Sequence, residues 1–107
     1  MSGIGELELS VLLTVAKLAD EAYGASERRE VSSLANRDYS VGCIYTTLQR
    51  LEDKGLVTSA MSEPTAIRGG RAKRCFRITA LGERTARAAH QARTALWKGV
   101  PSRLRAT

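Results

Sequence analysis

The sequence predicts a mainly helical protein with one small β-hairpin. Three observations support this fold class. Apolar residues recur with the helical period through the first half of the chain. Two short runs suited to strands then flank a glycine pair, which is the pattern of a hairpin. A final run rich in alanine and arginine, both strong helix formers, predicts a terminal helix.

Length and composition favour one globular domain. At 107 residues the chain can bury a core, although a second subunit would add buried surface. Hydrophobic residues make up 43% of the chain, and no apolar run approaches the roughly 18 residues of a membrane helix. The start of the chain lacks the pattern of a secretion signal, so we expect a cytoplasmic protein without a membrane partner.

The cysteines do not suggest a metal site. Cys43 and Cys75 are far apart in the sequence, no CxxC pair is present, and the chain has a single histidine. We expect two reduced thiols and no metal. A redox role for either thiol stays open.

Charge is distributed unevenly. Residues 1–63 contain 6 Lys and Arg against 10 Asp and Glu, whereas residues 64–107 contain 11 against a single acid, Glu83. The formal net charge is +6. This asymmetry favours a polyanion-binding surface built mainly by the second half, and a merely solvated basic surface is the alternative.

The first helix is expected over residues 5–19. It carries two apolar stripes on different faces, which predicts that it packs against two partners. One partner is the domain core. The second stripe, with Leu9 and Leu13, indicates a second subunit.

A second helix is expected over residues 25–36. Its expected inward-facing residues are Val31, Leu34 and Ala35, and its expected outward-facing residues are Glu27, Arg28, Arg29 and Glu30. The short polar turn of residues 37–40 leads into a third helix. Two helices joined by so short a turn are typical of a helix-turn-helix.

The third helix is expected to begin after Ser40, a good N-cap, and to end before Gly55. Ile44, Leu48 and Leu51 fall on one face. The opposite face combines an aromatic ring, a hydroxyl, an amide and a guanidinium, which suit base edges and phosphates. The expected DNA contacts of this segment are Ser40, Gly42, Tyr45, Thr46, Gln49 and Arg50. Alternatively, Gln49 and Arg50 form a solvated face.

Strands are expected over residues 56–61 and 73–78, with a hairpin tip marked by Pro64 and the glycine pair 69–70. Between residues 64 and 78 the chain has no acid and five cations: Arg68, Arg71, Lys73, Arg74 and Arg77. Glycine lets the backbone approach a phosphodiester chain, and arginines supply charge-assisted hydrogen bonds. A basic hairpin directly after a helix-turn-helix is the wing of a winged helix. We expect Arg68, Arg71 and Lys73 to contact DNA.

The last helix is expected over residues 80–98, with Thr79 as N-cap. Its apolar stripe is mostly alanine, which permits close approach of another helix. The expected dimer interface comprises Leu9, Leu13, Ala89, Leu96 and Trp97. We therefore expect a winged helix-turn-helix domain (1–79), a dimerisation helix (80–98) and a flexible tail (99–107).

Three motifs occur in a familiar order. Tyr23-Gly24 comes first, GCIY and LQRLEDKGLV follow within residues 42–57, and GRAKRCFRIT with Gly82 follows at residues 70–82. With these motifs the chain resembles the PadR family of winged-helix transcriptional regulators over nearly its whole length. The single helix after the wing resembles the family's short-C-terminus group.

The resemblance implies a function. Such regulators are dimers joined through the first and last helices, usually repressors, and small molecules or other signals release them from operator DNA. It also implies that the Tyr45 hydroxyl donates to a phosphate; the alternative is a half-buried ring under the wing. The chain departs from the family pattern at residues 25–28, where the family has an aromatic and then an acid–aliphatic pair, and at Thr46, where proline is common.

Other functions are less well supported by the residues. The acid pair Glu52-Asp53 is expected to lie on a solvated helix end, and no nucleophile–base pair or phosphate-cradling loop is evident, so we expect neither an enzyme nor a cofactor. The alternative function is a small-molecule sensor with an apolar cleft between subunits, where Trp97 either stacks on a planar ligand or forms interface core. A protein-binding winged helix without DNA is disfavoured by the basic hairpin. We therefore predict a homodimeric DNA-binding regulator of a palindromic operator.

Overall fold

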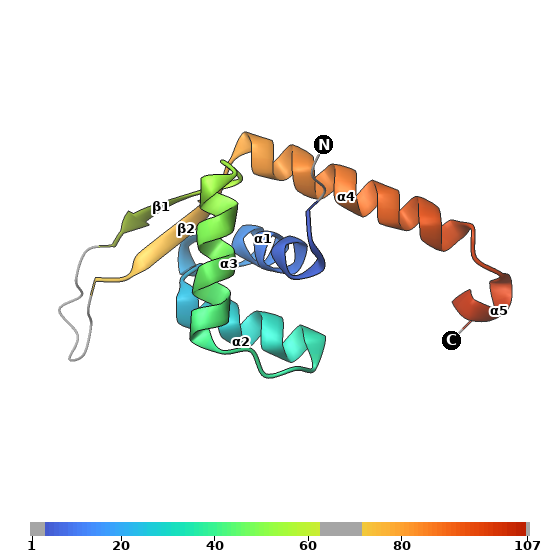
Figure 1. Cartoon of the computed structure of the whole chain (residues 1–107), viewed down its shortest axis with the longest axis horizontal. Coiled ribbons are helices and arrows are strands. Elements are labelled where there is room, and N and C mark those ends of the chain that lie inside the picture. Colours follow the sequence, from blue (N-terminus) through green and yellow to red (C-terminus); the bar gives the residue numbers. More distant parts are fainter. Residues whose placement is uncertain (1–3, 63–71, 107) are drawn as a thin grey trace.

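The computed structural model describes residues 4–62 and 72–106. In chain order the elements are α1 (Glu6–Leu18), the 3-10 turn η1 (Ala19–Glu21), α2 (Gly24–Ala35), α3 (Val41–Asp53), β1 (Val57–Met61), β2 (Arg74–Ile78), α4 (Ala80–Lys98) and α5 (Ser102–Arg105) (Figure 1). The predicted fold class, mainly helical with one small hairpin, is confirmed. Most of the expected hairpin tip, including Arg68 and Arg71, lies outside the described residues.

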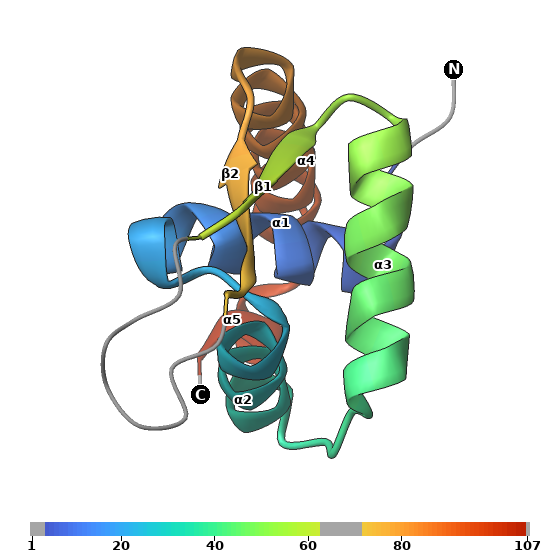
Figure 2. The ribbon, with the colours of Figure 1, turned by 90° about the vertical axis from the view of Figure 1, so that its left-hand side faces the viewer.

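Helices α1, α2 and α3 surround one core, and the hairpin lies against it (Figure 2). The largest fully buried apolar side chains are Val11, Leu12 and Val15 of α1, Ile44, Leu48 and Leu51 of α3, and Val57 of β1. Each such side chain contributes about 1.5–3 kcal/mol by leaving water. The apolar face of α3 read from the sequence therefore forms part of the core, together with one side of α1.

Strand β2 is held on both of its edges. It pairs antiparallel with β1, with Val57 opposite Ile78 and Ser59 opposite Phe76. On its other edge the Phe76 N–H donates to the Ala22 carbonyl at 2.8 Å, and Tyr23 forms an isolated bridge with Cys75. The hairpin is thus attached to the segment that leads into α2.

The orientation expected for α2 was partly wrong. Val31 is buried as expected, but Leu34 is 69% exposed and Ala35 is also exposed. Glu27, expected to face outward, is fully buried. Gly24, Glu27 and Val31 are all buried, at spacings of three and four, so helical geometry places the Glu27 carboxyl in the interior.

Glu27 is a buried carboxyl without a counterion. Neither of its carboxyl oxygens has a hydrogen-bond partner among the described residues. Burial raises the pKa of Glu27 from its ordinary 4.5 to about 8, and the nearby charge of Glu30 adds to the rise. Glu30 itself forms an ion pair with Lys17. The neutral, protonated form of Glu27 is therefore favoured near pH 7.

The ring of Tyr45 rests on Gly24. A Cβ atom at Gly24 would lie 2.4 Å from Tyr45 Cε2 and 2.9 Å from its hydroxyl oxygen. The same ring meets Phe76 edge-on, with ring centroids 6.5 Å apart. Three elements, α2, α3 and β2, therefore meet at one aromatic ring, and only glycine leaves room for it.

Helix α4 leaves the domain on the side opposite the hairpin (Figure 1). Its start packs closely, because the Thr79 hydroxyl accepts from the Gly82 N–H at 3.0 Å and a Cβ atom at Gly82 would lie 2.1 Å from the Leu56 carbonyl oxygen. Beyond that point only Ala86 is buried. The radius of gyration is 15.8 Å, against about 13 Å for a compact domain of this size.

The C-terminal segment expected as a flexible tail contains the short helix α5. Within residues 4–62 and 72–106, every helix is too short or too polar to cross a membrane.

We predict that wild-type stability falls as pH rises from about 4.5 to 8. Over this range folded Glu27 keeps a proton that the unfolded chain has released, and the loss is on the order of 3–5 kcal/mol. Glu27→Gln cannot ionise, so its stability should lack this dependence on pH. Glu27→Leu should lack it too and should be more stable than wild type at pH 8. Urea denaturation at pH 5, 6.5 and 8 measures both effects. Parallel pH profiles for wild type and Glu27→Gln would contradict the assignment.

We also predict that Gly24→Ala destabilises the protein by about 1–3 kcal/mol, because the new methyl group displaces the Tyr45 ring. In a Tyr45→Ala background the same substitution should cost nothing measurable. A double-mutant cycle by chemical denaturation tests this coupling. Equal destabilisation in both backgrounds would show that the ring is not the obstacle.

Candidate nucleic-acid interface

Helix α3 is fixed at both ends by features that the sequence predicted. The Ser40 hydroxyl accepts a hydrogen bond from the Cys43 N–H at 3.0 Å, and Gly55 follows the helix with φ of 76°. Ile44, Leu48 and Leu51 anchor one face in the core. The opposite face is therefore held rigidly toward solvent.

The exposed face of α3 contains most of the side chains expected to contact DNA. Gly42, Tyr45, Thr46, Gln49 and Arg50 are all exposed. Two of them are partly engaged within the helix: the Thr46 hydroxyl donates to the Gly42 carbonyl at 2.9 Å, and Gln49 Nε2 donates to Asp53 Oδ1 at 3.0 Å. The structure therefore brings these residues onto one face.

Tyr45 packs under the wing, as one of its two sequence interpretations expects. Its side chain is 40% exposed, and its ring lies between Gly24 and Phe76. Donation of a hydrogen bond from the Tyr45 hydroxyl to a phosphate stays a prediction.

The wing is joined to α3 by a polar network that sequence reasoning missed. Arg74 donates to Glu52 Oε1 at 3.1 Å and to Ser59 Oγ at 3.0 Å, and Ser59 Oγ donates to Glu52 Oε2 at 2.6 Å. Glu52 was expected on a solvated helix end, but it lies seven residues after Tyr45 and four residues after Leu48, and so it faces the hairpin. That spacing was the available signal.

An acid from outside the hairpin also pairs with Arg77, the other arginine of β2. Arg77 pairs with Asp20 of η1 at 2.6 Å, an exposed ion pair that adds little stability. Lys73 has a different neighbour, because its ammonium lies 4.2 Å from the centroid of the Tyr23 ring. Residues 64–78 contain no acid of their own, so acids from other parts of the fold partly neutralise their positive charge.

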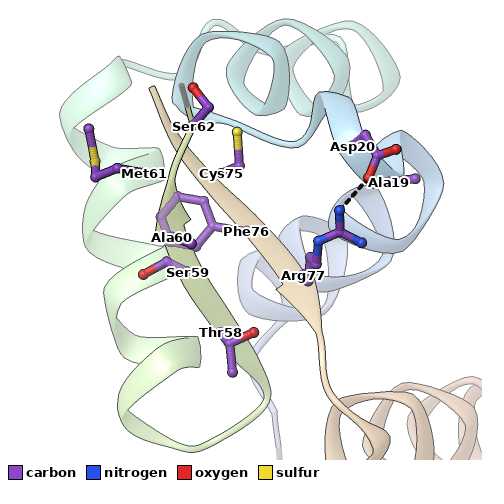
Figure 3. Close-up of a pocket in the computed structure, with 10 residues that line it drawn as sticks. All are labelled: Ala19, Asp20, Thr58, Ser59, Ala60, Met61, Ser62, Cys75, Phe76 and Arg77. Carbon is purple, nitrogen blue, oxygen red and sulfur yellow. Dashed lines mark hydrogen bonds and ion pairs between the residues drawn. The ribbon is translucent and has the colours of Figure 1, made fainter. Parts of the chain in front are cut away.

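A hollow of about 310 Å³ lies between the hairpin and η1 (Figure 3). Phe76 and Met61 lie on the α3 side of the hairpin, whereas Cys75 and Arg77 lie on the η1 side. The lining residues include none of those expected to bind DNA. This hollow is therefore separate from the exposed face of α3.

The residues expected at a dimer interface do not all lie on an open surface. Leu13, Leu96 and Trp97 are 45%, 76% and 53% exposed, and Ala89 is half-buried. Leu9 is instead buried within the single chain, because its side of α1 faces the core. Leu34, which the sequence placed inward, joins Leu13 in lining a shallow apolar groove of about 260 Å³.

Comparisons with known proteins agree with this geometry. The model of the transcriptional regulator PadR-like family matches residues 12–88. No curated protein shows significant similarity to the chain.

Several solved structures share the fold. A PadR-like transcriptional regulator from Bacillus cereus is 20% identical, with a TM-score of 0.74, 92% of this chain and 90% of that chain covered. A PadR family transcriptional regulator from Eggerthella lenta is 26% identical, with a TM-score of 0.67 and coverage of 92% and 87%. A Streptococcus transcriptional regulator is 27% identical, with a TM-score of 0.70 and coverage of 86% and 85%.

The family match extends over well more than half of the chain, from the middle of α1 into α4, and includes all of α2, α3 and the hairpin. The capped α3 with its exposed polar face lies inside the matched region. The chain therefore belongs to the PadR-like family of transcriptional regulators and is a DNA-binding regulator, not an enzyme.

Proposed function

We propose that the protein is a sequence-specific dimeric repressor that inserts α3 into the major groove and lays its wing along the DNA backbone. The observation that carries this proposal is the division of α3 into a buried apolar face and an exposed polar face. Such a helix can present polar groups to base edges without any rearrangement of the core. A repressor of this kind would act in the cytoplasm, on chromosomal DNA.

The dimensions of α3 support this docking. Its 13 residues make a helix about 20 Å long, and an α-helix fits the major groove, which is about 12 Å wide. Gln49 and Arg50 carry the amide and guanidinium groups that pair with adenine and guanine. We assign them the reading role, while Ser40, Gly42, Tyr45 and Thr46 hold the register on the backbone.

The projecting α4 supports a dimer. A single chain leaves Leu96 and Trp97 in solvent on a helix with only two buried residues. A second subunit seated along α4 and against Leu13 would cover these side chains. A two-fold dimer matches a palindromic operator, with half-sites one helical turn or a multiple apart.

A small-molecule sensor is the second candidate. The exposed indole of Trp97 supports it, because a planar ligand could stack on the ring between two subunits. Quenching of Trp97 fluorescence by a panel of planar aromatic compounds, together with release of DNA, tests this candidate. Quenching without any change in DNA affinity would argue against a regulatory role.

The test of DNA recognition is selection of binding sites from a random duplex library, followed by footprinting. We expect an enriched sequence with two-fold symmetry, bound at least about a thousandfold more tightly than random DNA. Gln49→Ala should relax the preference at one position of each half-site. Arg71→Ala should weaken binding to all sequences and lower the salt slope by about 1. No enrichment, or a uniform loss in both variants, would exclude α3 as the reader.

The dimer has its own test. Replacing Leu96 with Glu should lower the dimer fraction at least about tenfold in sedimentation equilibrium, because a charge would be buried at the interface. The matched control is Gln91→Glu, which adds the same charge at an exposed position on the same helix. A dimer unaffected by the Leu96 change would place the interface elsewhere.

A further inference from the structure

A groove of about 620 Å³ separates the starts of α2 and α3 from the wing. Three cations line it, Arg29 from α2, Lys73 from the segment before β2, and Arg74 from β2, and none of its described lining residues is acidic. Tyr23 and Tyr45 also form part of its wall. A groove with several cations, two tyrosines and no carboxylate among its described residues favours an extended anion.

We propose that this groove seats the phosphodiester backbone of one DNA strand and that Arg29 is a phosphate-contacting residue. The inference rests on the docking proposed above. If α3 occupies the major groove and the wing follows the backbone, the strand between them must pass between α3 and the wing. The groove lies at that place, and its wall includes Tyr45 of α3 and Lys73 of the wing.

The three cations are not equivalent. Arg74 is committed to Glu52 and Ser59, so it positions the wing on α3. Among the described residues Arg29 makes no ion pair, and its side chain is exposed. Lys73 lies against the Tyr23 ring, a weak attraction that leaves its three N–H donors able to turn toward a phosphate.

The position of Arg29 agrees with a backbone contact and not with base reading. It belongs to α2, the first helix of the helix-turn-helix, and that helix crosses the backbone in this motif. A guanidinium at this place can bind two phosphate oxygens at once. Arg29 should therefore add affinity without adding sequence preference.

The first experiment measures binding to random duplex DNA at several salt concentrations. Arg29→Ala should weaken binding on the order of tenfold and lower the slope of log K against log salt by about 1. Arg29→Lys should keep most of the slope, because the charge stays. The matched control is Arg87→Ala, which removes the same charge from an exposed position of α4, the helix that leaves the domain on the side opposite the hairpin (Figure 1). Thermal unfolding of each variant shows whether the fold is intact.

The second experiment locates the contact with methylphosphonate-substituted duplexes, in which one phosphate at a time lacks its charge. One substitution should weaken wild type but leave Arg29→Ala unchanged, because the lost contact is the same in both. The inference would be overturned if every methylphosphonate substitution weakened Arg29→Ala as much as it weakens wild type. It would also be overturned if the salt slope of Arg29→Ala equalled that of wild type. That outcome leaves the proposed function standing when wild type still selects a symmetric site, whereas no selection by wild type would reject the proposed function itself.

Discussion

The attachment of β2 to the helical body is the constraint on which the rest of the structure depends. Hydrogen bonding of Phe76 to Ala22 fixes one edge, the Tyr45 ring packs beneath, and Arg74 reaches across to Glu52. The partners of β2 in these contacts belong to the segment before α2 and to α3. Together they set the separation between the wing and α3, and that separation determines whether both can meet one DNA duplex.

The charge of the wing is governed by the same contacts. The strand arginines are paired with Glu52 and Asp20, which lie in the acidic half of the sequence. A basic segment therefore does not translate directly into a basic surface. Two cations of the groove beside α3, Arg29 and Lys73, have no described acid partner, and they come from two different parts of the chain. Ion pairing thus separates cations that position the wing from cations that can bind phosphate.

Glu27 is the main point where the core departs from a simple apolar interior. After Tyr23-Gly24, where the resemblance implies an aromatic and then an acid–aliphatic pair, this chain has Ala25-Ser26-Glu27-Arg28. The Ser26 hydroxyl instead accepts from the Tyr23 N–H at 3.1 Å and so satisfies the start of α2. The carboxyl of Glu27 occupies the buried position, and burial raises its pKa because no described counterion offsets the loss of solvent.

The sequence by itself determined the order of the elements, the cap and apolar face of α3, and the family, because these depend on residues close together in the chain. Ser40 and Ile44, Leu48 and Leu51 are such a local set. Only the tertiary structure decided the burial of Glu27, the exposure of Leu34, and the pairing of Arg74 with Glu52. These depend on how each helix is rotated and on which residues meet across the core. Helical periodicity places residues on a common face, but contacts between elements determine which face is buried.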